Sequence, residues 1–131
     1  MKQFLSWEGR MNRGSFLGNN LLATVIGVAG ILIILAGDHL GRSMEILFGL
    51  TGMIVIVCAS LRNMAITARR LHDLNASGML VWPYLIVCGL AGKIVGLWVI
   101  GLLAFLAMLL LPGNKTANQY GDVPGNVEKI P

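Results

Sequence analysis

Charged side chains are scarce in this sequence of 131 residues. They make up 12% of the chain, whereas hydrophobic residues make up 56%. A soluble domain carries roughly 25% charged residues, because its surface must face water. The shortage of charge therefore excludes an ordinary soluble globular domain and favours a protein whose outer surface faces lipid.

The sequence also lacks every motif that would point to catalysis or metal binding. Cys58 and Cys88 each lie inside an apolar stretch, and no CxxC pair or Cys/His cluster surrounds them. No P-loop, HExxH, GxSxG or dinucleotide-binding motif is present. We therefore expect no cofactor, no metal site and no enzymatic activity. The net charge of +4 lies between apolar runs and not in a nucleic-acid-binding module, so we also expect no nucleic acid partner.

Long apolar runs are what the sequence does contain. The first, from Phe16 to Gly37, has no charged residue. As a helix it would reach roughly 33 Å, enough to cross the ~30 Å hydrocarbon core of a bilayer. We predict an all-α fold, a polytopic transmembrane bundle of four helices that forms a single membrane domain over residues 1–131. Its expected parts are a cytoplasmic N-terminal segment, four transmembrane helices and a cytoplasmic tail, at residues 1–15, 16–37, 46–61 with a stalk to 71, 79–90, 94–111 and 112–131.

The apolar stretch from Met79 to Leu111 is too long for one crossing, since a straight helix over it would reach roughly 50 Å. Lys93 stands near its middle, flanked by glycines. A lysine at mid-bilayer is costly, and clustered glycines favour a turn. We therefore divide the stretch into two helices, the first of them short and containing Pro83. Leaving it undivided would give three helices in place of four.

The distribution of lysine and arginine predicts which way the helices face. In the four-helix arrangement the N-terminal segment, the stalk and the tail share one side, and that side carries eight of the ten basic residues. Because cytoplasmic loops are enriched in Lys and Arg, we expect both termini in the cytoplasm. A three-helix arrangement would move the tail across and weaken the bias to six against three, with Lys93 left inside the membrane.

Three polar clusters carry a resemblance to a known family. They read GRMNRGSF at residues 9–16, ARRLHD at 68–73 followed by Ser-Gly at 77–78, and LPG at 111–113 followed by NQYG at 118–121. In this order and spacing they resemble the bacterial family known as domain of unknown function 805, over nearly the whole chain from about Phe4 to Asp122. The resemblance implies a small multi-pass protein of the bacterial cytoplasmic (inner) membrane, and it assigns no activity.

The charged residues and the histidine of these clusters form the candidate site. They are Arg10, Arg13, Arg69, Arg70, His72 and Asp73. On a helix, Arg69 and Asp73 are four residues apart and can form an ion pair. Two interpretations stay open: a structural brace in which Asp73 anchors the arginines, and an anion site in which guanidinium groups bind phosphate or a lipid headgroup. His72 and Asp73 point about 100° apart, which argues against a catalytic relay.

The expected function is that of a non-enzymatic membrane protein with a basic cytoplasmic face. Through that face it would bind or scaffold membrane lipid, including anionic lipid, a second copy of itself or a larger membrane partner. One alternative is a small oligomeric transporter or channel subunit, which a polar path reaching Lys93 would favour. The other alternative is an enzyme acting on a lipid headgroup, which a closed pocket joining the candidate residues would favour.

Overall fold

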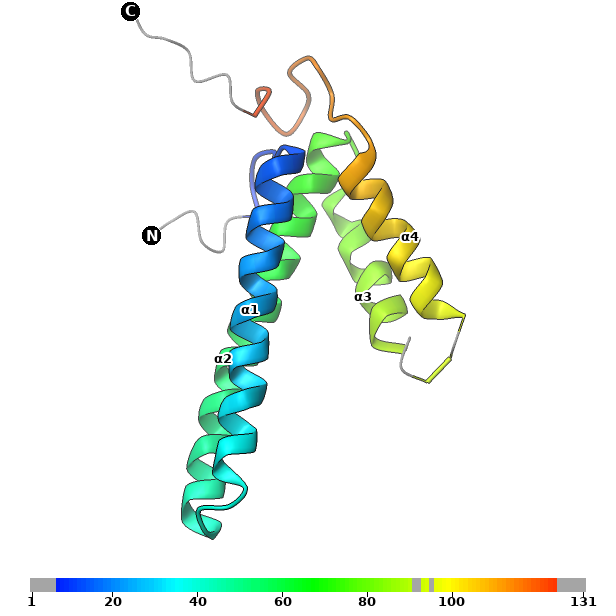
Figure 1. Ribbon diagram of the computed structural model, residues 1–131. Coiled ribbons are helices and arrows are strands. Elements are labelled where there is room, and N and C mark those ends of the chain that lie inside the picture. The colour runs from blue at the N-terminus through cyan, green and yellow to red at the C-terminus, as the bar shows by residue number, and fades with distance from the viewer. Residues whose placement is uncertain (1–6, 91–92, 95, 125–131) are drawn as a thin grey trace, which may run out of the picture.

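The computed structural model describes residues 7–90, 93–94 and 96–124, and these residues are helical with no strand. The helices are α1 (Arg13–Gly37), α2 (Arg42–Asp73), the 3-10 helix η1 (Gly78–Leu80), α3 (Val81–Leu90) and α4 (Leu97–Leu110). Figure 1 shows a long hairpin, α1–α2, and a short hairpin, α3–α4, that meet at one end and diverge toward the other. The expectation of an all-α chain with four α-helices is confirmed.

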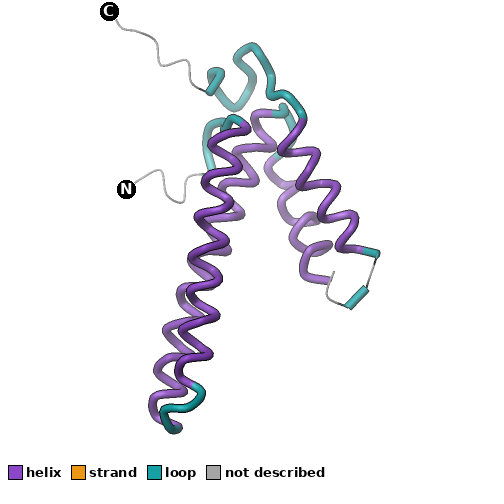
Figure 2. Tube along the Cα trace, in the orientation of Figure 1, coloured by secondary structure: helices purple, strands orange, loops and turns teal. Residues whose placement is uncertain are grey.

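The helix boundaries differ from the predicted ones for local reasons. α1 begins three residues before Phe16 because the side chain of Asn12 caps it, accepting a hydrogen bond of 2.8 Å from the backbone N–H of Ser15. The predicted second helix and its stalk are one unbroken helix, α2. Lys93 lies in the connection between α3 and α4, as the division of the apolar stretch predicted (Figure 2).

α1 and α2 pack as an antiparallel pair through residues spaced seven apart. Buried positions with this spacing are Phe16, Ala23, Gly30 and Gly37 in α1, and Gly52, Ala59, Ile66 and Asp73 in α2. A seven-residue spacing keeps one face of each helix toward its partner. A β-carbon added at Gly52 would lie 2.5 Å from the carbonyl oxygen of Gly30. The two backbones therefore approach so closely that only glycine fits at this level.

The apolar core lies at the end where the two hairpins meet. Its buried members are Met11, Phe16, Ala23, Ile66 and Met108, and half-buried Leu71, Leu74, Tyr84, Phe105 and Leu109 pack against them. The rings of Phe16 and Phe105 join α1 to α4 with centroids 5.6 Å apart. This core fixes the short hairpin against the long one at the end that also carries the polar clusters.

Away from this core, the large apolar side chains of the helices are mostly exposed. Leu21, Ile54 and Leu110, for example, are 63%, 64% and 66% exposed. Among the described residues, α1 and α2 are the helices long and apolar enough to cross a membrane. Helices that bury little apolar surface within the protein are suited to lipid, because a soluble monomer rarely exposes so large an apolar area.

The short hairpin offers no second pair of full-length spans. The helical segments Gly78–Leu90 and Leu97–Leu110 would each reach roughly 20 Å, against a hydrocarbon core of ~30 Å. The structure therefore supplies two candidate spans where the sequence predicted four.

Candidate functional site

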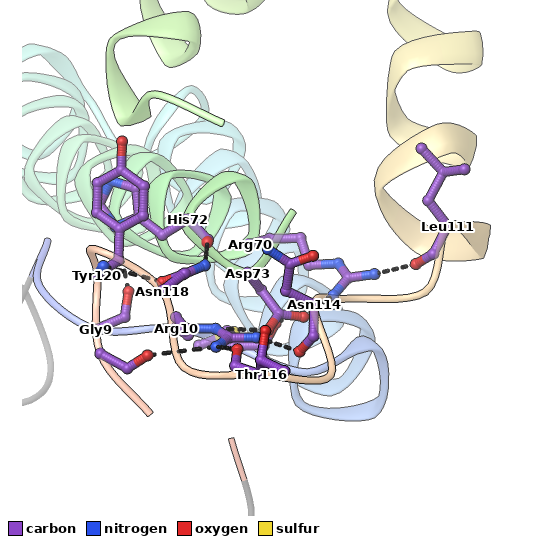
Figure 3. A network of polar contacts seen from close by, with 12 residues as sticks. Gly9, Arg10, Arg70, His72, Asp73, Leu111, Asn114, Thr116, Asn118 and Tyr120 are labelled. Carbon is purple, nitrogen blue, oxygen red and sulfur yellow. Dashed lines mark hydrogen bonds and ion pairs between the residues drawn. The ribbon is translucent and has the colours of Figure 1, made fainter. Parts of the chain in front are cut away.

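The last turn of α2 carries a buried cluster of charges. The carboxylate of Asp73 accepts a hydrogen bond from Arg70 Nη1 through Oδ2, and it pairs with Arg10 at 2.9 Å through Oδ1. All three side chains are between 0% and 4% exposed. We call Arg10, Arg70 and Asp73 the brace (Figure 3).

The ion pair that helical spacing allows between Arg69 and Asp73 does not form, and Asp73 pairs with Arg10 and Arg70 instead. Residues three apart on a helix share a face as well as residues four apart do. Here Arg70, three residues before Asp73, lies on the side that faces the end of α4, and it is fully buried there. Arg69 points elsewhere, and the second partner of Asp73 comes from the N-terminal segment.

Arg70 joins three separate parts of the chain through its guanidinium group. Its Nε donates to the carbonyl oxygen of Met108 at 2.6 Å and its Nη2 to that of Leu111, also at 2.6 Å. Its Nη1 donates to the carbonyl of Met11 at 3.3 Å as well as to Asp73. The last carbonyls of a helix have no partner within the helix, so Arg70 supplies donors that the end of α4 needs.

Opposing effects act on the pKa of the Arg70 guanidinium group. Burial lowers the pKa of its guanidinium group and is the largest influence, while the carboxylate of Asp73 raises it. The nearby positive charge of Arg13 lowers the same pKa. Arginine stays charged at physiological pH in proteins, so the carboxylate is the counter-ion that makes this burial tolerable.

Arg10 fastens the segment after α4 to the end of α2. Its Nη1 donates to the carbonyl oxygens of Thr116, at 2.8 Å, and Gly121, at 3.3 Å, and its Nη2 donates to that of Asn114. The backbone N–H of Asn114 in turn donates to the carbonyl of Asp73 at 2.9 Å. Gly113 lies against this contact, and a β-carbon there would collide with the carboxylate of Asp73.

His72 is held on the other side of the α2 terminus, away from the brace. Its Nδ1 lies 3.2 Å from the carbonyl oxygen of Gly9, a distance at which a protonated Nδ1 donates to that carbonyl. The imidazole stacks on the ring of Tyr120, with centroids 3.9 Å apart and planes 4° apart (Figure 3). Gly78 leaves room for it, since a β-carbon there would lie 2.6 Å from His72 Nε2. His72 therefore joins the end of α2 to the segment before α1, through Gly9, and to the segment after α4, through Tyr120.

Arg13 and Arg69 stand beside the brace without joining it. Arg13 is exposed, and its Nη1 makes a long hydrogen bond of 3.4 Å to the carbonyl of Leu110. Arg69 is half-buried, and its Nε has no hydrogen-bond partner among the described residues. Burial lowers the pKa of Arg69, and the neighbouring charge of Arg62 lowers it further. Of the six candidate residues, three thus form one bonded cluster and three surround it.

The candidate site predicted from the sequence did not include the residues after α4 that contact the brace and His72. These are Gly113, Asn114, Thr116, Asn118 and Tyr120. Asn118 donates through Nδ2 to the carbonyl of His72 at 2.9 Å. The LPG and NQYG clusters were the available signal, because they mark the two stretches of the tail that contact residues 72–73.

A pocket of about 170 Å³ opens beside the brace. It is lined by Asn12, Arg13, Arg70, Asp73, Gly113, Asn114, Lys115, Val123 and Pro124. Its walls come from the start of α1 and from the segment after α4, with Arg70 and Asp73 between them. Within the described residues, His, Cys, Asp and Glu side chains form no group of three that could hold a metal ion.

Comparison with known proteins gives a family and no activity. No curated protein matches the chain, and no solved structure does either. A family model described as a protein of unknown function (DUF805) matches residues 4–122. That range contains the three polar clusters and the whole brace. The chain therefore belongs to the family of proteins of unknown function DUF805.

Proposed function

We propose that this protein is a non-enzymatic component of the bacterial inner membrane that holds lipid or a protein partner at its basic cytoplasmic end. The observation that carries the proposal is the contrast between the two ends of the molecule. One end is closed by the brace, which ties α2, α4, the N-terminal segment and the tail together. The rest of α1 and α2 exposes apolar side chains.

In the proposed topology, α1 and α2 cross the bilayer and return the chain to the side on which it began. The N-terminal segment and the residues after α4 contact each other through Arg10, so they lie on the same side. Six of the eight basic residues that the structure describes belong to that side, and the excess of lysine and arginine favours the cytoplasm. Two crossings keep both termini cytoplasmic, as four would.

The α3–α4 hairpin would enter the membrane from the cytoplasmic side without crossing it. Its base is fixed by the core around Met108 and by Arg70. Each arm reaches roughly 20 Å, so the connection that contains Lys93 would lie inside the bilayer, about 10 Å short of the far boundary. A lysine side chain that extends toward that boundary would place its ammonium group near the headgroups.

The polar contacts of the described residues favour binding over catalysis or transport. Both carboxylate oxygens of Asp73 are bound to arginines, and His72 is stacked and hydrogen-bonded away from them. Within the apolar helices, the hydroxyls of Thr24, Thr51 and Ser60 each donate to a carbonyl four residues earlier. This arrangement supplies neither a free base beside a nucleophile nor a row of side chains for a passing ion.

The proposal is tested by washing membranes that contain the protein with alkaline carbonate, then extracting it in mild detergent for native mass spectrometry. We expect the protein to stay in the washed membrane and to leave the detergent micelle with bound lipid or with a stoichiometric protein partner. Release of the protein by the wash would contradict the proposal, and so would a mass spectrum that contains only the monomer without bound lipid or partner.

A further inference from the structure

We propose that the pocket beside the brace binds the phosphate of an anionic lipid headgroup, with Arg13 and Lys115 as its principal cations. This inference deepens the proposed function and rests on it, since it names the ligand that the basic end holds. The pocket is formed by Asn12 and Arg13 at the start of α1 and by Asn114 and Lys115 after α4. At about 170 Å³, it has room for a phosphate group with part of its ester.

The charge of the pocket favours an anion. Its lining contains the cations Arg13, Arg70 and Lys115 and one carboxylate, that of Asp73. That carboxylate already pairs with Arg10 and Arg70. No ion pair forms on Arg13 or Lys115 within the part of the chain that the structure describes, and both side chains are exposed. Two positive charges therefore face the opening without an acidic partner from the described residues.

Arg13 retains most of its capacity to donate hydrogen bonds. A guanidinium group has five N–H donors in a planar fork that matches the oxygens of a phosphate. The long bond of 3.4 Å to the carbonyl of Leu110 involves Nη1 alone. Arg13 is also the first residue of the 25-residue helix α1, so the positive end of the helix dipole adds to the side-chain charges.

In the proposed topology, Arg13 and Lys115 lie at the depth of the lipid headgroups because of their positions in the sequence. Arg13 comes three residues before the apolar stretch that begins at Phe16, and Lys115 comes four residues after Leu111, the apolar residue that directly follows α4. Basic residues just outside a membrane-spanning segment attract anionic lipid. A phospholipid is therefore the source of phosphate that this pocket meets first, and a free phosphate ion or ester offers the same chemistry.

The test is a titration of the purified full-length protein with phosphatidylglycerol in native mass spectrometry, with phosphatidylcholine as the zwitterionic comparison. The double variant Arg13→Gln/Lys115→Gln should bind phosphatidylglycerol about 25-fold more weakly, because each of the two basic residues near the headgroups contributes about a factor of five. Arg42→Gln is the matched control, since Arg42 is exposed but begins α2 at the end away from the brace. It should bind as the wild type does.

A second titration, with inorganic phosphate in detergent free of lipid, separates the two sources. Weak or absent binding of inorganic phosphate, together with phosphatidylglycerol binding that is about 25-fold weaker in the double variant, supports the headgroup assignment. Equal affinity of the double variant and the wild type for phosphatidylglycerol overturns the assignment, whatever inorganic phosphate does. If the wild type still retains lipid or a partner in that case, the pocket assignment fails while the proposed function stands. Equal melting temperatures would show that the double variant folds.

Discussion

At the scale of single residues, the burial of Arg70 depends on how completely its charge is met. A buried guanidinium without a partner costs several kcal/mol, whereas one that is paired and hydrogen-bonded costs much less. Arg70 has a carboxylate and three backbone carbonyls around it. Asp73 is the counter-ion of two arginines, so its loss should destabilise this cluster more than the loss of any other member.

Asp73→Asn should destabilise the protein strongly, because it leaves Arg10 and Arg70 without their counter-ion. We expect the free energy of unfolding to fall by about 3 kcal/mol, as for other buried pairs from which one charge is removed. Denaturation in detergent, followed by circular dichroism, measures this change. Asp122→Asn removes an exposed carboxylate and should change stability by less than about 0.5 kcal/mol. Equal melting of Asp73→Asn and the wild type would refute the structural importance of the brace.

Gly113→Ala should also destabilise the protein, by about 1 to 3 kcal/mol, because the new methyl group would press on the carboxylate of Asp73. Gly18→Ala is the matched control, since a β-carbon at Gly18 meets nothing within 4 Å. The same denaturation measurement compares the two. If both alanines were tolerated alike, the tail would not lie against Asp73 as described.

The site residues show what a sequence can and cannot predict at this scale. The three clusters grouped Arg10, Arg70 and Asp73 among the candidate residues, and the structure brings these three side chains into contact. Helical periodicity could not choose between Arg69 and Arg70 as the partner of Asp73, since both lie within one turn of it. That choice depends on where the end of α4 packs, which is a long-range contact that local spacing does not contain.

At the scale of the helices, the α1–α2 pair is held by the small residues at its seven-residue spacing. Gly52 should therefore not tolerate a side chain, while Gly49, where an added β-carbon meets nothing within 4 Å, should. We expect Gly52→Ala to lower the free energy of unfolding by about 1 to 3 kcal/mol. Gly49→Ala should be neutral or stabilise by up to about 1 kcal/mol, because alanine is the better helix former. Unfolding in detergent measures both, and the reverse order would contradict this packing.

The depth to which the α3–α4 hairpin enters the membrane can be tested by fluorescence quenching. A bimane fluorophore at Ile94→Cys, in a variant with Cys58→Ser and Cys88→Ser, should be quenched by lipids brominated on their acyl chains and little by iodide in the water. The same label at His39→Cys, in the turn after α1, should show the opposite pattern. Strong iodide quenching at both positions would mean that the short hairpin crosses the membrane completely, or lies outside it.

The helices themselves were largely predictable, and their lengths were less so. Uncharged apolar runs located α1 and α2, and the position of Lys93 among glycines located the break between α3 and α4. The N-terminal boundary of α1 depended on the Asn12 cap, which periodicity alone does not reveal. The shortness of α3 and α4 weakens the prediction of four spans, because an apolar sequence shows that a helix suits lipid but not that it crosses a bilayer.

At the scale of the whole molecule, the chain combines one closed polar end with long apolar arms. Figure 1 shows the start of α1 and the described segment after α4 on the side where the hairpins meet, and the turn between α1 and α2 at the opposite extreme. The proposed topology therefore requires this turn and the tail to lie on opposite sides of a membrane. In that topology, the basic residues of the polar end would gather at a single leaflet, and the pocket beside the brace would meet lipid headgroups.

The most direct test is labelling of single cysteines with a membrane-impermeant maleimide in intact bacterial cells. His39→Cys marks the turn after α1, and Ala117→Cys marks the tail, each in a variant with Cys58→Ser and Cys88→Ser. We predict that His39→Cys is labelled in intact cells, whereas Ala117→Cys is labelled only after the membrane is permeabilised. Labelling of both positions from the same side would contradict a membrane-crossing α1–α2 hairpin, and the cytoplasmic basic end would be lost with it.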